Sequence, residues 1–451
     1  MDYHRQHAEQ SQAIRRVFDL QNHHQWNVRA RTASQRAASL LRLKECIRRR
    51  EPEIRFALFQ DLRKPIDGPS EFSFLHEIDT TVAQLAQWMQ DIELDPLPEF
   101  GTAKSFITYE PKGVVLLFGP WNFPFALVFQ PLVAIIAAGN CAIVKPNEMA
   151  PATSRITAQI IREVFPENEV AVFEGNVELA NALLELPFDH IFFTGSPKVG
   201  RAVMVAAASH LASVTLELGG KNPAVVDGTV DLREAAKRIA LARSKNAGQI
   251  CLCPDYVFVP ESLQSDFITH LKSAIQSTFY ANGTIDKEAY EKIIDDRNFA
   301  RLEGYLRDAV ARGARIELGG EADPNDRTFH PTILTHVAPE SAILQEETFG
   351  PILPVLTYKH PEEVIEFIRA RGKPLALYVF SNDRSFIEHI VQNTSSGGVT
   401  VNDCFSHCRD VRLPFGGVNT SGIGRYHGIH GFKELSHERA IFKTHCGKAL
   451  E

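Results

Sequence analysis

The sequence predicts an α/β protein with two Rossmann-like parallel sheets. Short runs of apolar residues, such as GVVLLFG (residues 113–119) and HIFFTG (190–195), alternate with longer segments of helical spacing, such as residues 154–165. Strands that alternate with helices form parallel sheets joined by crossovers. The alternation starts again after Gly220, which predicts a second unit of the same class.

Composition is that of a globular protein with an ordinary core. The chain has 451 residues, 44% of them hydrophobic, and this length favours two or three domains. The net charge of −7 is modest, and the most basic run, RLKECIRRR at residues 42–50, alternates with apolar residues. That alternation is typical of a solvated amphipathic helix, so we expect no nucleic-acid partner.

Cysteines and apolar runs indicate the compartment. Seven scattered cysteines, an odd number, are not typical of a disulfide framework and indicate a reducing environment. The N-terminus is too polar for a secretion signal. The longest apolar run, residues 126–139, contains Gln130 and Pro131 and is too short to span a bilayer. We therefore expect a cytoplasmic protein with no membrane partner.

The predicted elements follow one another from helices to two sheets. Helical spacing dominates from about residue 5 to residue 92, and FGTAKSFITYEPKG (100–113) predicts an extended arm. A soft boundary near residues 218–221 separates the two α/β units. The expected strands lie at residues 113–119, 141–146, 170–175, 190–195, 255–260, 351–358 and 374–383. The expected helices of the two units lie at residues 154–165, 199–210, 265–279 and 362–371.

Ligands of open parallel sheets bind where strands end and helices begin. In FFTGSPKVG, Gly195 and Gly200 bracket such a turn, and Ser196 is a candidate N-cap. A helix that begins after glycine suits a pyrophosphate, because its free N–H groups and its dipole attract anions. The turn does not match the Gly-x-Gly-x-x-Gly fingerprint, so a plain tight turn is the alternative.

Two charged residues follow another predicted strand, in IVKPNE. Lys145 and Glu148 could hold the ribose hydroxyls of an adenine nucleotide, as acidic residues do in dinucleotide folds. The alternative is a surface salt bridge.

Three further motifs carry candidate chemistry. LELGGKNP places Glu217 between leucines at a strand end. Its carboxyl group is either buried with a partner or has a raised pKa that suits a general base. Asn122 lies between prolines in GPWNFP and could donate to an oxyanion or support the turn. NAGQICLCPDY holds Cys251 and Cys253, whose Cys-x-Cys spacing matches no common zinc or thioredoxin pattern.

The order and wording of these motifs resemble the aldehyde dehydrogenase superfamily. In that family the nucleophilic cysteine follows the pattern Asn-x-Gly-Gln-x, which matches NAGQI before Cys251 in this sequence. QEETFGPILPV, KPLALYVFSND, SSGGVTVND and LPFGGVNTSGIGRYHG are similar to further signatures, so the resemblance covers about residues 30–443. The short N-terminus, YEPKGVV, LPFDHIFFTG and the SHERA ending resemble the class 3 branch and its bacterial aryl-aldehyde relatives.

The resemblance implies a covalent mechanism. Cys251 would attack the aldehyde, the Asn122 amide would stabilise the oxyanion, and hydride would pass to a nicotinamide. Glu217 would then activate the water that hydrolyses the thioester. Glu347 would hold the nicotinamide ribose, with a share in base work left open, and Phe349 would lie beside the nicotinamide ring.

A cofactor and a division of the chain are implied as well. Glu148 should repel a 2′-phosphate and Lys145 would tolerate one, so we expect NAD, with NADP as the alternative. The branch also implies a homodimer. The expected segments are 1–95 and 113–218 for the cofactor-binding domain, 219–412 for the catalytic domain, 413–432 as a return to the cofactor domain, and 96–112 and 433–451 as bridging or oligomerisation segments.

The stretch NDCFSHCRD could be a loop that determines substrate specificity or a metal site. In the family this loop lines the substrate entrance, which makes Asp403 and His407 candidates for specificity. Cys404, His407 and Cys408 supply only three groups without a matching pair, so we expect no metal. Cys253 is interpreted as a small hydrophobic residue, and the alternative is a thiol that bonds to Cys251 under oxidation.

The function predicted from the resemblance is oxidation of an aromatic or medium-chain aliphatic aldehyde to its carboxylic acid. Branches of the family that transfer the acyl group to coenzyme A usually lack a glutamate at the position of Glu217, so acyl transfer is the weaker alternative. A catalytically silent structural relative is a third reading. The intact set of Asn122, Glu217, Cys251 and Glu347 argues against it.

Overall fold

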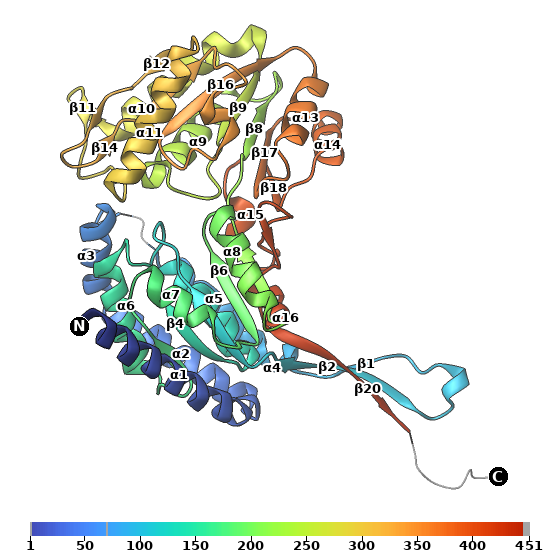
Figure 1. The fold of residues 1–451 in the computed structure, drawn as a ribbon. Coiled ribbons are helices and arrows are strands. Elements are labelled where there is room, and N and C mark those ends of the chain that lie inside the picture. The colour runs from blue at the N-terminus through green and yellow to red at the C-terminus, as the bar shows by residue number, and fades with distance from the viewer. Residues whose placement is uncertain (1, 69–70, 445–451) are drawn as a thin grey trace.

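The computed structural model describes residues 2–68 and 71–444 and contains two α/β bodies and a narrow arm (Figure 1). In the view of Figure 1 the body built from the earlier part of the chain lies below the second one, and the arm projects from the lower body. Each body contains one sheet of mainly parallel strands, which confirms the predicted fold class.

The first sheet has the strand order β19-β7-β6-β3-β4-β5 and is parallel except for β19. Side chains of β3 alternate between two apolar clusters, with Val115 and Leu117 in one and Val114 and Leu116 in the other. The strands are β3 (Val114–Phe118), β4 (Cys141–Lys145), β5 (Val170–Val172), β6 (His190–Thr194), β7 (Ser213–Glu217) and β19 (Gly422–Ile423).

Helices cover both faces of this sheet. Val17 of α1 and Leu179 of α7 pack into one cluster, and Leu43 of α2 packs into the other. The predicted helices at 154–165 and 199–210 are α6 and α8, which begin earlier because a proline occupies the first helical position of each. The helices of this body are α1 (Asp2–Arg29), α2 (Ala33–Arg49), α3 (Glu51–Leu62), α4 (Leu75–Trp88), α5 (Ala126–Ala138), α6 (Pro151–Val164), α7 (Val177–Leu184), α8 (Pro197–Ala208) and α16 (Gly428–Glu434).

The second sheet has the strand order β12-β15-β16-β9-β8-β17-β18 and is parallel except between β12 and β15. Its central strands are buried along almost their whole length, as expected for strands covered on both faces. The strands are β8 (Pro223–Val226), β9 (Tyr256–Pro260), β12 (Arg315–Leu318), β15 (Thr332–Thr335), β16 (Ile352–Tyr358), β17 (Ala376–Phe380) and β18 (Gly398–Val401).

The remaining elements of the second body surround this sheet. Its helices are α9 (Leu232–Ser244), α10 (Gln264–Phe279), α11 (Asp296–Ala311), α12 (Ala342–Gln345), α13 (Pro361–Ala370), α14 (Arg384–Asn393) and α15 (Ser406–Arg409). Short hairpins pair β10 (Tyr280–Ala281) with β11 (Thr284–Ile285) and β13 (Ala322–Asp323) with β14 (Thr328–Phe329), and 3-10 turns occur at η1 (Pro98–Phe100), η2 (Lys245–Gly248) and η3 (Glu261–Leu263). No helix in the described part of the chain is long and apolar enough to cross a membrane.

The arm is an antiparallel sheet of β1 (Ile92–Glu93), β2 (Lys104–Pro111) and β20 (Ser436–Lys443). β2 lies within residues 100–113, where the sequence predicts an extended arm. β20 pairs with β2 over its whole length, from Lys104 opposite Lys443 to Pro111 opposite Ser436. The C-terminal part of the chain is therefore built into the arm (Figure 1).

We propose the domain division expected from the sequence, because each sheet is built from one set of segments. Residues 113–218 carry β3 to β7, residues 219–412 carry β8 to β18, and residues 413–432 bring β19 back to the first sheet. β1 belongs to the arm although it precedes the expected boundary at residue 96. Residues 1, 69–70 and 445–451 of the expected segments lie outside the described residues.

Arg36 closes the C-terminal end of α5. Its buried guanidinium donates to the carbonyl oxygens of Ala137 (3.0 Å) and Ala138 (2.6 Å), and to that of Arg29 at the end of α1 (2.9 Å). Gly139 follows with φ 91°, and a Cβ there would collide with the guanidinium. Burial, followed by the charge of Arg31, lowers the pKa of Arg36 to about 10. One side chain thus supplies donors to the ends of two helices.

Arg36→Met should therefore lower the free energy of unfolding by about 2–3 kcal/mol, because buried carbonyls lose their donor. Urea unfolding measures this change. Arg42→Met, at an exposed position on the same helix, is the control and should change stability little. Equal stability of the two variants would contradict the role given to Arg36.

Candidate active site

The carboxyl ends of four neighbouring strands meet at one edge of the first sheet. In register, Phe118 of β3 lies opposite Lys145 of β4 and Phe193 of β6, and Thr194 lies opposite Glu217 of β7. Backbone hydrogen bonds tie the following turns together, from Gly119 N to Lys145 O (3.0 Å) and from Gly195 N to Glu217 O (2.9 Å). The motifs of these turns therefore lie side by side.

The turn after β6 leads directly into α8. Ser196 is the N-cap, and its hydroxyl oxygen accepts from Val199 N (3.4 Å). A Cβ on Gly200 would lie 2.8 Å from the Leu218 side chain, and one on Gly195 would lie 2.5 Å from the Phe193 ring. Both glycines thus allow the start of α8 to pack closely against the strand ends.

Lys145 and Glu148 form an ion pair at the end of β4. The Lys145 side chain is buried, whereas that of Glu148 is partly exposed. The salt bridge expected as the plain alternative is thus present. The exposed part of the Glu148 carboxylate can still accept hydroxyl groups of a ligand.

Cys251 follows a strained turn in the second body. Asn246 and Ala247 in η2 have left-handed backbone angles, with φ of 54° and 49°. Gln249 holds this turn, since its amide donates to the carbonyl oxygens of Asn246 and Lys292 (both 3.0 Å). Cys251 follows Gln249 closely in the chain, and its side chain is partly exposed.

Asn222 fixes the other side of the cysteine loop. Its amide nitrogen donates to Cys251 O (2.7 Å) and Cys253 O (3.0 Å), and its amide oxygen accepts from Ala376 N (2.9 Å). Sequence reasoning missed Asn222 and Gln249. The only sequence signal for them was that each is a polar residue within a motif, Asn222 in LELGGKNP and Gln249 in NAGQICLCPDY.

Asn122 reaches across from the first body to the cysteine loop. Its amide donates to Gln249 O (3.0 Å), and its backbone oxygen accepts from Lys64 Nζ (2.9 Å) and Asn246 Nδ2 (3.1 Å). Lys64 in turn pairs with Glu71 (2.5 Å) in a buried ion pair.

Glu71 also supports the turn of Asn122 from the far side. One of its carboxylate oxygens accepts from Phe125 N (3.0 Å) and Ala126 N (2.7 Å), the first residues around the start of α5. The pair of Lys64 and Glu71 therefore fixes both ends of the segment that carries Asn122. No sequence signal marked either residue.

Glu217 is a buried carboxyl group at the end of β7. Neither of its carboxylate oxygens has a hydrogen-bond partner within the described residues. Burial raises its pKa well above the usual value; Arg425 opposes this shift and Glu434 adds to it. A buried carboxyl group without partners favours its protonated form and binds a proton readily.

The charges of two carboxyl groups affect the pKa of the Cys251 thiol. Burial raises its pKa well above the usual value, and the negative charges of Glu347 and then Glu217 raise it further. The structure thus brings together a cysteine from the second body, a glutamate from the end of the first sheet and a glutamate from the turn before β16. Asn122 contacts the cysteine loop through the carbonyl oxygen of Gln249.

Glu347, in the turn before β16, packs against the turn that follows Glu217. Its carboxylate fills the space that a Cβ on Gly219 would need, and the Gly220 N–H donates to it. Burial, followed by the charge of Asp255, raises its pKa to about 8. The carboxyl group is therefore held within the site by backbone.

Phe349 has a left-handed φ of 42° and places its ring against Trp121. The two rings meet edge to face, with centroids 5.2 Å apart. Arg301 fixes this turn, because its guanidinium donates to Thr348 O (2.7 Å) and Phe349 O (3.3 Å). Phe349 thus stands beside the residue that precedes Asn122.

The two residues expected at a substrate loop have other partners. Asp403 pairs with Arg238 of α9 (3.3 Å) and accepts from Ser406. His407 is buried with its Nδ1 2.7 Å from Thr400 Oγ1, and burial lowers its pKa to about 4. Across residues 2–68 and 71–444, no group of three or more His, Cys, Asp or Glu side chains is arranged to hold a metal ion.

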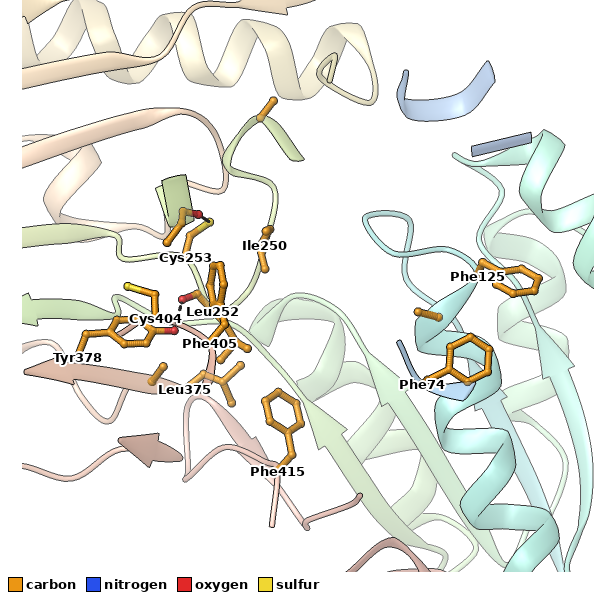
Figure 2. Packing of buried hydrophobic residues seen from close by; sticks show 14 of the residues in the cluster. Phe74, Phe125, Ile250, Leu252, Cys253, Leu375, Tyr378, Cys404, Phe405 and Phe415 are labelled. Atoms are coloured by element: carbon orange, nitrogen blue, oxygen red, sulfur yellow. Dashed lines mark hydrogen bonds between the residues drawn. The ribbon is translucent and has the colours of Figure 1, made fainter. Parts of the chain in front are cut away.

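Cys253 is buried behind the cysteine loop. Its thiol donates to Ala242 O of α9 (3.0 Å), and burial raises its pKa to about 12. Figure 2 shows this hydrogen bond, with Tyr378 close by donating to Leu252 O (2.7 Å). This position is that of a core thiol.

The residues at this edge fit a nicotinamide dinucleotide. A helix begins after β6 where a phosphate can bind, and Glu148 can accept ribose hydroxyls after β4. Glu347 and Phe349 supply a carboxylate and an aromatic ring beside Cys251. The candidate nucleophile, the candidate base and the residues expected to bind the dinucleotide thus belong to one site.

Comparison with known proteins agrees with this site. The sequence profile of the aldehyde dehydrogenase family matches residues 3–441. The chain is 47% identical over 440 residues to the putative aldehyde dehydrogenase AldX of Bacillus subtilis, covering 95% of this chain and 97% of AldX. It is 42% identical over 414 residues to the 4,4'-diaponeurosporen-aldehyde dehydrogenase of Staphylococcus aureus, covering 91% and 89% of the two chains.

Solved structures share the fold and show the cofactor. The substrate-bound AldH of Staphylococcus aureus superposes with a TM-score of 0.92 at 38% identity, over 97% of this chain and 95% of that one. An indole-3-acetaldehyde dehydrogenase in complex with NAD+ gives a TM-score of 0.88 at 25% identity, over 97% and 89% of the chains. A glyceraldehyde-3-phosphate dehydrogenase from Methanocaldococcus jannaschii, in complex with NADP, gives 0.85 at 25% identity, over 96% and 94%.

A profile match over nearly the whole chain, a relative at 47% identity and the same fold leave one conclusion. The protein belongs to the aldehyde dehydrogenase family and is an NAD(P)-dependent oxidoreductase that acts on aldehydes.

Proposed function

We propose that the chain oxidises an aldehyde to its carboxylic acid through a thioester on Cys251. The observation that carries this proposal is the buried, unpartnered Glu217 carboxyl group whose charge acts on the Cys251 thiol. In the first step the Cys251 thiolate attacks the carbonyl carbon and forms a thiohemiacetal. The Asn122 amide and the Cys251 backbone N–H stabilise the oxyanion, and losing such a donor costs about 3 kcal/mol of barrier.

The cofactor would be held between the two bodies. Lys145, Glu148 and the start of α8 would bind the adenosine and phosphate part, and Glu347 and Phe349 the nicotinamide part. When bound, the oxidised nicotinamide accepts the hydride that leaves the thiohemiacetal carbon.

Glu217 would complete the reaction as general base. It takes a proton from water, the water oxygen attacks the thioester carbon, and the carbon–sulfur bond breaks. The carboxylic acid leaves and the thiolate of Cys251 is restored. The raised pKa of Glu217 makes its carboxylate a stronger base, and the presence of this glutamate supports water as acyl acceptor in preference to coenzyme A.

For the substrate we propose an aromatic or medium-chain aliphatic aldehyde. Two relatives are compatible with this class, an indole-3-acetaldehyde dehydrogenase and a 4,4'-diaponeurosporen-aldehyde dehydrogenase. Apolar side chains near Cys251, such as Ile250 and Phe405, are compatible with it. The cytoplasmic location stays a prediction from the sequence.

A homodimer is part of the proposal because two apolar surfaces lie exposed. On and after α8, Val205 is 72% exposed and Leu211 is 94% exposed. On the arm, Phe442 is 55% exposed and packs edge to face with Phe100. Exposed apolar groups of this kind are typical of surfaces that bind another protein chain.

Cys251→Ala should abolish NAD(P)H formation with benzaldehyde, cinnamaldehyde and hexanal, because the proposed reaction passes through a thioester on Cys251. The absorbance of the reduced nicotinamide measures it, and chromatography should identify the free acid as the wild-type product. Cys253→Ala, a change behind the loop, should keep most of the activity. Turnover by Cys251→Ala would show that the nucleophile is another residue.

Glu148→Gln should raise kcat/KM for NADP relative to NAD by about tenfold, because removal of one charge near a 2′-phosphate is worth about 1.4 kcal/mol. Initial rates with both cofactors give the ratio. Glu185→Gln, at an exposed position at the end of α7, is the control. An unchanged ratio in Glu148→Gln would place the 2′ position away from Glu148.

Val205→Asp should shift the protein toward monomer, because a buried unpaired carboxylate opposes association. Light scattering coupled to size-exclusion chromatography measures the mass. Val310→Asp on α11, at a position 44% exposed, is the matched control and should leave the mass unchanged. A wild-type mass of one chain would refute the dimer itself.

A further inference from the structure

A chain of hydrogen bonds runs through the first sheet beside Glu217. β7 alternates so that Ser213, Thr215 and Glu217 point to the same face of the sheet. His190 of β6 lies opposite Ser213 and is completely buried among apolar strands. Its imidazole lies 2.8 Å from Ser213 Oγ and 3.0 Å from Thr215 Oγ1.

The two ends of this chain have opposite hydrogen-bonding character. Lys112 Nζ lies 3.2 Å from His190 Nδ1 at one end, and Thr215 Oγ1 donates to Glu434 Oε1 (2.8 Å) at the other. An ammonium group only donates, and an ionised carboxylate only accepts. The protons are therefore ordered, with Lys112 donating to Nδ1, Nε2–H donating to Thr215, and Thr215 donating to Glu434.

This order requires a neutral imidazole and a charged carboxylate. Burial, and then the charge of Lys112, lower the pKa of His190 well below its usual value, which agrees with a neutral ring. The charge of Glu434 in turn opposes the lowering of the Lys112 pKa by burial. The chain thus ends in a hydrogen bond that Thr215 donates to the Glu434 carboxylate.

The Lys112 end of the chain meets solvent far from Cys251. A cavity of about 660 Å³ lies at the amino ends of β3, β6 and β7, on the sheet edge opposite to the active site, and Lys112 and Ser213 line it. Water in this cavity can hydrate the ammonium group, which keeps the donor end of the chain charged.

The Glu434 end lies next to Glu217. A Cβ on Gly424 would lie 2.5 Å from Glu434 Oε1, and a Cβ on Gly416 would lie 3.1 Å from Glu217 Oε1. A Cβ on Gly416 would also meet the Gly424 carbonyl, so the two glycines are in contact. The backbones of these glycines stand between the two carboxyl groups.

The charged groups that face Glu217 come from several elements. Burial is the main cause of its raised pKa, the guanidinium of Arg425 opposes it, and the carboxylate of Glu434 on α16 adds to it. Arg425 is also engaged by backbone, donating to Gly417 O (2.5 Å) and Gly424 O (2.7 Å). The neighbouring titratable groups are the Cys251 thiol and the Tyr426 phenol, on both of which Glu217 acts.

We propose that Glu434 is a positioning residue for thioester hydrolysis, its carboxylate held beside Glu217 by the chain from Lys112 through His190 and Thr215. This proposal rests on the proposed role of Glu217 as general base. A fixed negative charge makes Glu217 a stronger base, which favours proton transfer from water.

The hydrolysis step can be isolated without cofactor. p-Nitrophenyl acetate acetylates the Cys251 thiolate and releases p-nitrophenolate, and water then cleaves the acetyl thioester. Mass spectrometry of the quenched protein follows loss of the acetyl group from pH 5 to pH 9. Glu217 acts in its deprotonated form, so the rate falls as pH drops through the pKa of Glu217.

Glu434→Gln should move this acidic limb to lower pH by about half a unit, because removal of a like charge lowers the pKa of Glu217. Glu434→Asp keeps the charge and should lie between Glu434→Gln and wild type. Glu438→Gln, an exposed change on β20, is the control and should keep the wild-type limb. An unchanged limb in Glu434→Gln, with folded protein, overturns the proposal.

Glu217→Gln separates this inference from the proposed function. Loss of hydrolysis in Glu217→Gln, together with an unshifted limb in Glu434→Gln, leaves the base in place and removes only the role of Glu434. Hydrolysis with a wild-type limb in Glu217→Gln shows that the base is another residue, and the role of Glu434 falls with it.

Discussion

The site depends on the hydrogen bonds that Asn122 makes across the two bodies. Its side chain donates to Gln249 O, and its backbone oxygen accepts from Asn246 beside the cysteine loop. Because Asn122 belongs to the first body and Cys251 to the second, these contacts set where the proposed nucleophile lies relative to the strand ends. The buried ion pair of Lys64 and Glu71 fixes Asn122 from behind. The two sheets supply a rigid frame, and this small polar junction aligns them.

Three buried acidic groups are gathered in the site. Burial is the main cause of the raised pKa of Glu217, Glu347 and Cys251, and the charges of the two glutamates raise the pKa of Cys251 further. Burial thus disfavours the charged form of each of these groups. This environment suits the proposed mechanism, in which a thiol loses a proton and a carboxylate accepts one within the same turnover.

Much of the fold could be predicted from the sequence, because buried parallel strands appear as short apolar runs and their turns carry glycine, proline and polar residues. The strands at residues 113–119 and 190–195 are examples, and the later strands of the second unit are others. Residues such as Lys64, Glu71 and Asn222 could not be found in this way. Their roles depend on partners that lie far away in sequence, and local patterns carry no record of those contacts. The same holds for Glu434, which meets Thr215 only after the chain has returned to the first sheet.

The return of the chain also sets the order in which the protein can be completed. β19 joins β7, and β20 joins β2, so the first sheet and the arm both need residues that leave the ribosome after those of the second body. Until then β7 and β2 are open edges, with unpaired backbone groups that attract other strands. The strands of the second body, β8 to β18, are all synthesised after β7 and before β19, so this body can fold first. The body whose strands are made earliest is therefore the last to be finished, and its nascent edges are where premature association has to be prevented.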